Sequence, residues 1–210
     1  AVTFTNKAAR EMQGRIVNLL QLTEGGQRTR DKGQGTLGPQ SFVLSPRLPV
    51  MGTFHAICAR MLRRDIEHIG RNRNFVIYDT GDQESLMKEV LKEMKIDVKE
   101  LKARTALAHI GRCKCEALSV REVAEQATTE FTARIARAYA NYQVKLKAAN
   151  ALDFDDLILE TVRLFSEVPK VLARYQETWR SLNVDEYQDT NHAQYLMISL
   201  LAGKHRNICV

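Results

Sequence analysis

Apolar positions follow two patterns along this chain. Short β-branched or aromatic runs, which strands favour, occur near residues 2, 51, 183 and 208, whereas residues 56–178 carry apolar side chains at helical spacing. Strands that alternate with helical segments are typical of a parallel sheet in an α/β fold. The pattern therefore predicts parallel strands towards both ends of the sequence and a helical block, with almost no strand signal, between them.

The helical segments carry start signals and buried faces. Segment 55–69 has an apolar stripe, expected in the core, and three arginines that lie largely off the stripe and are expected to be solvated. The stripe is Ile57, Met61, Leu62 and Ile66, and the arginines are Arg60, Arg63 and Arg64. Capping-box spacing predicts helix starts at Thr80 with Gln83, Ser119 with Glu122, and Asn191 with Gln194.

Residues 23–49 break the helical pattern. Their five glycines and three prolines predict a long loop, partly disordered. The sequence also opens on the strand-like run "AVTFTN" and stops on the strand-like run "RNICV". Both ends are expected to cut through a sheet, so the chain is expected to be a fragment of a larger protein.

The composition indicates which kind of partner and which cellular compartment to expect. A net charge of +6 and a pI near 9.2 favour a polyanionic partner without requiring one. The four cysteines lack the paired spacing of secreted scaffolds, which favours a reducing cytoplasm, and His109, Cys113 and Cys115 are too few for a structural zinc site. No apolar run approaches the length of a membrane span, so we expect a cytoplasmic protein without a membrane partner.

The stretch "LNVDEYQDTN" carries the strongest chemical signal. Asp185 and Glu186 follow a short apolar run, and carboxylates at the end of a buried strand can hold Mg²⁺ and activate a water for attack on a phosphoryl group. Open α/β sheets place ligands at this end of their strands. The alternative is a helix N-terminus at Asn191, where acidic residues are favoured by the helix dipole. The two interpretations can coexist.

Three ordered motifs resemble one protein family. "VDEYQDTN" resembles the Walker B motif of the UvrD, Rep and PcrA family of superfamily 1 DNA helicases. "AVTFTNKAAREM" at residues 1–12 resembles motif Ia of that family, and "GTFHAICARMLR" at residues 52–63 resembles motif Ib. "NFVIYDTGDQ" and "ALDFDDLI" are similar to further family signatures. The matches cover nearly the whole chain.

The resemblance implies roles for the acidic stretch. Asp185 would bind Mg²⁺, Glu186 would be the base that activates water, and Gln188 would lie near the γ-phosphate of ATP. ATP and Mg²⁺ would be needed by the complete protein, and no cofactor would be required by the fragment. The acidic residues Asp153, Asp155 and Asp156 are expected to be helix-dipole partners, not a second metal site.

The resemblance also implies a nucleic-acid track. Motifs Ia and Ib would contact single-stranded DNA near a duplex junction, through Phe4, Thr5, Asn6, Thr53 and His55. An aromatic ring offers any base a stacking face, and Thr or Asn can bind phosphates without reading sequence. Alternatively, Phe4 is a buried strand residue and His55 is a helix-start residue with a satisfied ring.

The fold implied is a partial RecA-like P-loop NTPase parallel sheet, cut at both ends, with a large all-α insertion, mostly helical overall. The ATPase domain, 1A, would comprise residues 1–55 and 179–210, and the insertion, 1B, residues 56–178. The phosphate loop G-x-x-x-x-G-K-[ST] does not occur in the sequence, and the second motor domain would belong to the rest of the helicase chain. Asn183, which interrupts the apolar run, predicts a frayed or one-sided strand.

We therefore expect a parent protein that is an ATP-dependent 3′–5′ DNA helicase of repair or replication, and a fragment that does not hydrolyse ATP. Two alternatives remain. One is a fragment of an AddA- or RecB-type helicase-nuclease, which has similar motifs. The other is a non-enzymatic, basic helical nucleic-acid-binding module, which leaves the order of the motifs unexplained.

Overall fold

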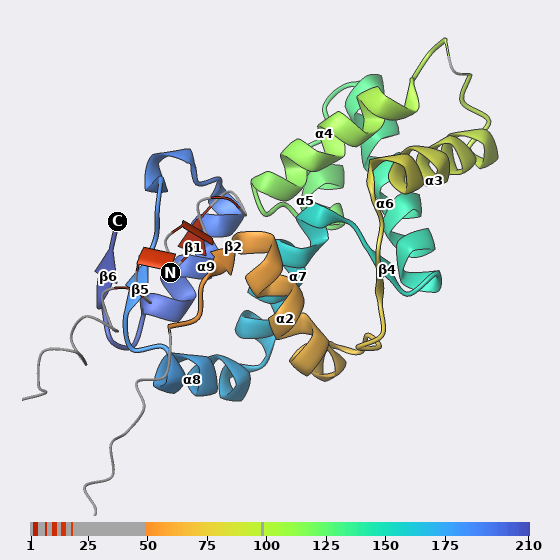
Figure 1. The fold of residues 1–210 in the computed structure, drawn as a ribbon. Helices are drawn as coiled ribbons and strands as arrows, with labels where there is room; N and C mark the ends of the chain where they lie inside the picture. Colours follow the sequence, from red (N-terminus) through yellow and green to blue (C-terminus); the bar gives the residue numbers. More distant parts are fainter. Residues whose placement is uncertain are drawn as a thin grey trace, which may run out of the picture.

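The computed structural model describes residues 2–3, 7, 10–11, 14–15, 18, 49–97 and 99–210. Phe4, Thr5, Asn6 and all of the predicted loop except Pro49 lie outside the described residues. Figure 1 shows a mainly helical chain with short strands. The four predicted strand positions are confirmed, and they are β1 (Val2–Thr3), β2 (Gly52–Thr53), β5 (Leu182–Asn183) and β6 (Ile208–Cys209).

The strands pair in parallel, as the alternating pattern predicts. Val2 lies opposite Gly52 in the β1–β2 pair, and Leu182 lies opposite Ile208 in the β5–β6 pair. The described strands form separate two-stranded sheets and not one continuous sheet. A third parallel pair, β3 (Val76–Ile77) with β4 (Ala151–Leu152), lies inside the block where almost no strand was expected. This pair was not expected, because β3 and β4 are only two residues long and each is followed closely by a helical segment whose apolar spacing dominates the pattern.

The described helices include eight α-helices and two 3₁₀ turns. The α-helices are α2 (Phe54–Asp65), α3 (Thr80–Glu93), α4 (Ala103–Cys115), α5 (Val120–Glu125), α6 (Glu130–Ala148), α7 (Phe154–Glu167), α8 (Pro169–Thr178) and α9 (His192–Ala202), and the 3₁₀ turns are η1 (Ile66–Ile69) and η2 (Tyr187–Asp189). The apolar stripe of α2 and η1 is buried, and the three arginines of α2 are exposed, as predicted.

Capping boxes start several of these helices. The pairs predicted at Ser119 and at Asn191 are confirmed. The prediction for α3 is wrong by one residue, because the N-cap is Asp79, whose carboxylate accepts a hydrogen bond from Asp82 N at 2.9 Å. Asp82 in turn accepts from Asp79 N at 3.1 Å. Two carboxylates close this box, a pairing outside the Ser/Thr with Glu/Gln pattern on which the prediction rested.

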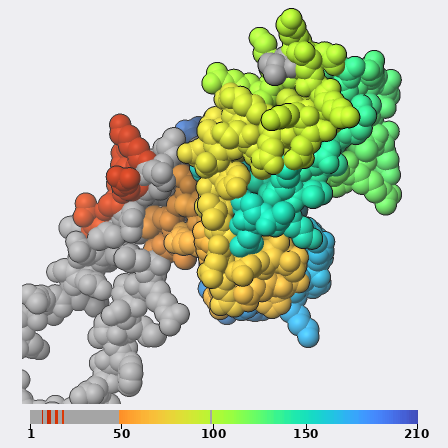
Figure 2. All heavy atoms as spheres, turned by 90° about the vertical axis from the view of Figure 1, so that its right-hand side faces the viewer, coloured from red at the N-terminus to blue at the C-terminus, as the bar shows by residue number. Residues whose placement is uncertain are grey.

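Buried side chains form two hydrophobic cores. The first joins α2, η1, α7, α8, β5 and α9, and the second joins α3, α4, α5 and α6. Figure 1 shows the corresponding two lobes, and Figure 2 shows the yellow-green to green helices of the second core projecting beyond α2. The boundaries predicted for the insertion, residues 56 and 178, stay a prediction. The buried contacts group α2, α7 and α8 with α9, because their apolar faces cover the same interior.

Candidate functional site

The acidic stretch begins where strand β5 ends. Leu182 N donates to Asn207 O at 3.0 Å and Val184 N donates to Cys209 O at 2.9 Å, so the chain remains paired with β6 up to Val184. Leu182 and Val184 are buried while Asn183 is exposed, which confirms a one-sided strand. Asp185 follows directly and is half-buried. The strand therefore delivers this carboxylate to the carboxyl end of the β5–β6 pair.

Glu186 has an uncommon backbone conformation. Its φ of 52° and ψ of 44° lie in the left-handed region, where residues other than glycine are rare and strained by about 1–3 kcal/mol. The side chain is exposed, and Gln188 Nε2 donates a hydrogen bond to its carboxylate. The turn thus brings Glu186 and Gln188 together at the surface. A solvent-facing carboxylate in this position can accept a proton from a water.

Helix α9 is capped without using the acidic pair. Asn191 Oδ1 accepts from Gln194 N at 2.9 Å, and Gln194 Oε1 accepts from Asn191 N at 3.0 Å. The turn η2 connects the acidic pair to this cap, and Tyr187 packs against the first core. The helix start at Asn191 is confirmed, and the acidic pair lies outside the cap, so the two interpretations are compatible.

The residues predicted to contact nucleic acid from motif Ib sit at the start of α2. Thr53 is only 8% exposed, and its Oγ1 caps the helix by accepting from Ala56 N at 3.2 Å. His55 is half-buried, and burial lowers its pKa against the opposing effect of Asp155. Burial therefore favours the neutral ring, which can both donate and accept a hydrogen bond.

An aromatic residue that the sequence analysis left unassigned lies beside His55. Phe154 is the first residue of α7, its side chain is 46% exposed, and its ring meets the His55 ring edge-on with centroids 5.9 Å apart. The sequence signal was an aromatic residue in the first turn of a helix, within the family-like stretch "ALDFDDLI", for which only the acidic residues were given an expected role. The contact joins two segments that are far apart in the sequence.

A buried lysine lies next to the start of α7. Lys114 of α4 is 1% exposed, and its Nζ lies 2.5 Å from Asp153 Oδ2 and 2.7 Å from Asp156 Oδ1. Tyr142 donates to Asp153 at 3.2 Å, and Gln143 donates to Asp156 at 2.9 Å. Asp153 and Asp156 also form the capping box of α7. The carboxylates are thus dipole partners, as expected, and also the counter-ions of a buried cation.

Burial and charge compete within this cluster. Burial alone would lower the pKa of Lys114, but Asp156 and Asp153 outweigh it and raise that pKa, so the ammonium stays charged. Burial opposes ionisation of Asp156, yet the Lys114 cation holds its pKa below the usual range. Burial, followed by the charge of Asp156, raises the pKa of Asp153 to about 6. Sequence reasoning missed Lys114 because nothing near it in the chain indicates burial.

Helix α4 packs closely against α7. A Cβ at Gly111 would lie 3.3 Å from Asp155 Oδ2, so glycine permits the close approach of α4 to α7. Burial, followed by the charge of Asp155, raises the pKa of the Cys115 thiol. Helix α4 therefore packs against α7 and α9, while the His55–Phe154 contact joins the start of α2 to that of α7. Within the described residues, no three His, Cys, Asp or Glu side chains gather as a metal-binding group, and no helix is long and apolar enough to cross a membrane.

Comparison with known proteins identifies the family of this chain. The chain is 42% identical over its whole length to proteins named ATP-dependent DNA helicase PcrA from Staphylococcus aureus, Bacillus subtilis and Leuconostoc citreum. It spans about a quarter of the length of these relatives, 26% of the first and 25% of the other two. Residues 1–210 match the family described as the UvrD/REP helicase N-terminal domain. The chain therefore belongs to the UvrD/REP helicase family.

Proposed function

We propose that this chain is part of an ATP-dependent DNA helicase that moves 3′ to 5′ along single-stranded DNA in repair or replication. The observation that carries the proposal is the acidic pair at the carboxyl end of β5 in a chain of this family. The 42% identity to proteins named PcrA favours the UvrD branch over a helicase-nuclease. The order of the family motifs argues against a simple basic binding module.

In this proposal the chain provides those residues of an ATP site that bind the metal ion and activate the attacking water. Mg²⁺ prefers oxygen ligands and is commonly bound by one or two carboxylates plus substrate phosphates, and Asp185 fits that donor set. The ion would neutralise charge on the phosphates. Glu186 would take a proton from the attacking water, and Gln188, already bonded to Glu186, would reach the γ-phosphate. The phosphates themselves would be held by a phosphate loop outside these residues.

The shared first core supports a revised domain division. We assign α2, α7 and α8, together with the strand pairs β1–β2 and β5–β6, to the RecA-like motor domain. The insertion then reduces to the second core with α3, α4, α5 and α6. Lys114 of the insertion forms buried ion pairs with Asp153 and Asp156 at the start of α7 in the motor domain. These ion pairs therefore connect the two domains.

The proposed DNA track runs along the starts of α2 and α7. His55 and Phe154 form its described aromatic part, and Phe4, Thr5 and Asn6 would extend it from motif Ia. The half-exposed ring of Phe154 offers a base a stacking face, while the neutral His55 ring can hydrogen-bond to a phosphate or a base. Thr53 acts mainly by holding the start of α2 in place.

Phe154→Ala is expected to weaken binding of a fluorescent oligothymidine to the 210-residue protein by about 1–3 kcal/mol, because one stacking face is lost. Fluorescence anisotropy at two salt concentrations measures this, and affinity should fall as salt rises. Phe131→Ala is the matched control, since Phe131 is 40% exposed and contacts His109 in the same edge-on way. Equal effects of the two substitutions, or no binding at low salt, would contradict the proposed track.

The 210-residue protein is expected to show no ATP hydrolysis above background, with or without DNA. Without backbone amides and a lysine around the phosphates, most of the electrostatic stabilisation of the transition state is missing. A coupled assay for released phosphate measures this. DNA-stimulated turnover that disappears in Glu186→Gln would show that these residues hold a complete site.

A further inference from the structure

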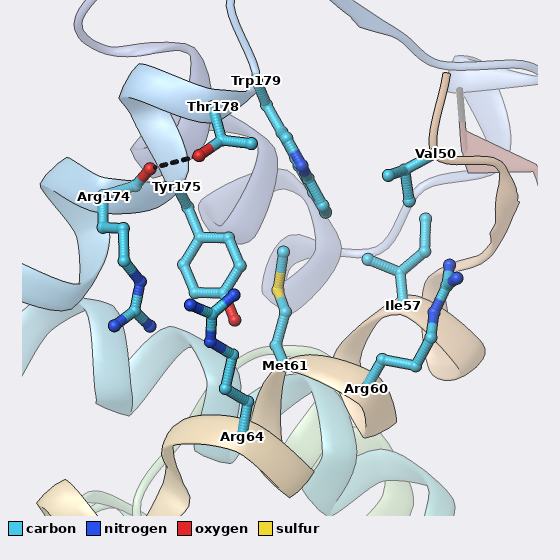
Figure 3. A pocket seen from close by; sticks show the side chains of 9 residues that line it. All are labelled: Val50, Ile57, Arg60, Met61, Arg64, Arg174, Tyr175, Thr178 and Trp179. Carbon is cyan, nitrogen blue, oxygen red and sulfur yellow. Dashed lines mark hydrogen bonds between the residues drawn. The ribbon is translucent and has the colours of Figure 1, made fainter. Parts of the chain in front are cut away.

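The structure has a cavity of about 330 Å³ whose described lining shares no residue with the proposed ATP and DNA sites. It opens between α2 and α8, beside the segment that leads into β2 (Figure 3). Its lining is Val50, Ile57, Arg60, Met61, Arg64, Arg174, Tyr175, Thr178 and Trp179. The cavity lies along α2 from Ile57 to Arg64, and Thr53 and His55 at the start of the helix are not among its lining residues.

The cavity has an excess of positive charge. Arg64 is exposed and has no ion pair or hydrogen bond with any residue that the structure describes. Arg60 makes only a 3.4 Å hydrogen bond to Met51 O within the described chain. Arg174 pairs with Asp65 at 2.5 Å, but its buried Nε donates to no acceptor among the described residues. Of these three guanidinium groups, only that of Arg174 pairs with a carboxylate among the described residues, and that carboxylate, of Asp65, does not line the cavity.

The remaining walls are apolar and aromatic. Figure 3 shows the Trp179 and Met61 side chains pointing towards each other, with Tyr175, Arg64 and Arg174 on one side of Met61 and Ile57 and Arg60 on the other. Val50 is 41% exposed at the mouth. Among the described residues, the lining contains no lysine, aspartate, glutamate, serine or alanine. Enrichment in Trp, Tyr, Met and Arg, with depletion of those other residues, is the composition of protein–protein interface cores.

We propose that this cavity docks an acidic segment of a partner protein, which inserts one apolar side chain between α2 and α8. The volume equals that of about ten water molecules, enough for one large side chain. Carboxylates flanking that side chain would pair with Arg60 and Arg64, and bidentate pairing suits guanidinium groups. A nucleic-acid backbone fits less well, because the charge surrounds an apolar hollow and does not follow an extended groove.

A display library of random 12-residue peptides, selected on the 210-residue protein, tests the chemistry of the partner. Enriched peptides are expected to carry several acidic residues around one aromatic or aliphatic residue. Selection on Arg64→Glu should lose this enrichment, because the new carboxylate would repel acidic peptides. The substitution should leave the fold intact, since Arg64 is exposed and makes no hydrogen bond or ion pair within the described chain. Arg112→Glu is the matched control, since Arg112 is exposed on α4 and bonds only within its own helix in the described chain. Enrichment without acidic residues would overturn the proposal.

Trp179 reports the site directly, because it is the only tryptophan in the sequence. An enriched peptide should change its fluorescence saturably, and Arg64→Glu should raise the Kd about tenfold or more while Arg112→Glu leaves it unchanged. Peptide binding that survives Arg64→Glu would overturn the proposal. An oligothymidine that changes Trp179 fluorescence in an Arg64-dependent manner would also overturn it, and would assign the cavity to nucleic acid.

Discussion

Lys114→Met is expected to lower the free energy of unfolding by about 3–5 kcal/mol, because it leaves two buried carboxylates without their cation. Asp153 and Asp156 are 3% and 2% exposed, so water cannot replace the lost charge without opening the structure. Both also cap α7, so repulsion between them would act on the start of that helix. Urea denaturation followed by circular dichroism measures the loss.

Lys145→Met is the matched control for this substitution. Lys145 also bridges two carboxylates, Glu89 at 2.6 Å and Glu93 at 2.8 Å, but these partners are more than half exposed. Its loss should cost no more than about 1 kcal/mol. Similar costs for the two lysines would contradict the claim that burial makes Lys114 important.

Removing the carboxylate charges should rescue the Lys114 variant. Lys114→Met combined with Asp153→Asn and Asp156→Asn should regain much of the lost stability, since asparagine can still cap a helix. The combined variant also keeps the test usable if Lys114→Met alone fails to fold. A combined variant that is less stable than Lys114→Met alone would show that packing, not unpaired charge, dominates.

Features that depend on local pattern could be predicted from the sequence. The one-sided strand at Leu182 and Val184, the capping box at Asn191 and the buried stripe of α2 each follow from residues within a few positions of one another. The position of Asp185 at a strand end follows from the same local pattern. Local spacing is sufficient for these features because they are set by strand pleat and helix turn.

Features that depend on distant segments could not be predicted. Lys114 sits between two cysteines in α4, and only the fold brings it to Asp153 and Asp156. The β3–β4 pair and the contact of His55 with Phe154 likewise join segments that are far apart in the chain. The division of the helices between two cores depends on which apolar faces meet, and helical spacing alone does not specify that.

Glu186→Gln in the complete protein that contains this segment is expected to reduce DNA-stimulated ATP hydrolysis about 10²–10⁴-fold. Glutamine keeps the size of the side chain but cannot take a proton from water. The bond from Gln188 can persist to the amide oxygen, so the turn should keep its shape. ATP binding should change little, because Glu186 is proposed to act on the water.

Glu177→Gln is the matched control for this substitution. Glu177 is an exposed glutamate on α8, the helix before β5, and it pairs with Lys204 at the surface. Its replacement removes one surface ion pair and should leave hydrolysis within about twofold of the unsubstituted protein. A large loss in this control would mean that the assay reports general damage near β5.

The central claim is that the end of β5 provides the catalytic carboxylate of an ATP site. The most direct test is the DNA-stimulated rate of ATP hydrolysis by the complete protein, measured at saturating ATP for the unsubstituted, Glu186→Gln and Glu177→Gln forms. We predict that only Glu186→Gln loses turnover, by at least about 10²-fold, while it still binds nucleotide. A Glu186→Gln protein that hydrolyses ATP at the unsubstituted rate would contradict the claim.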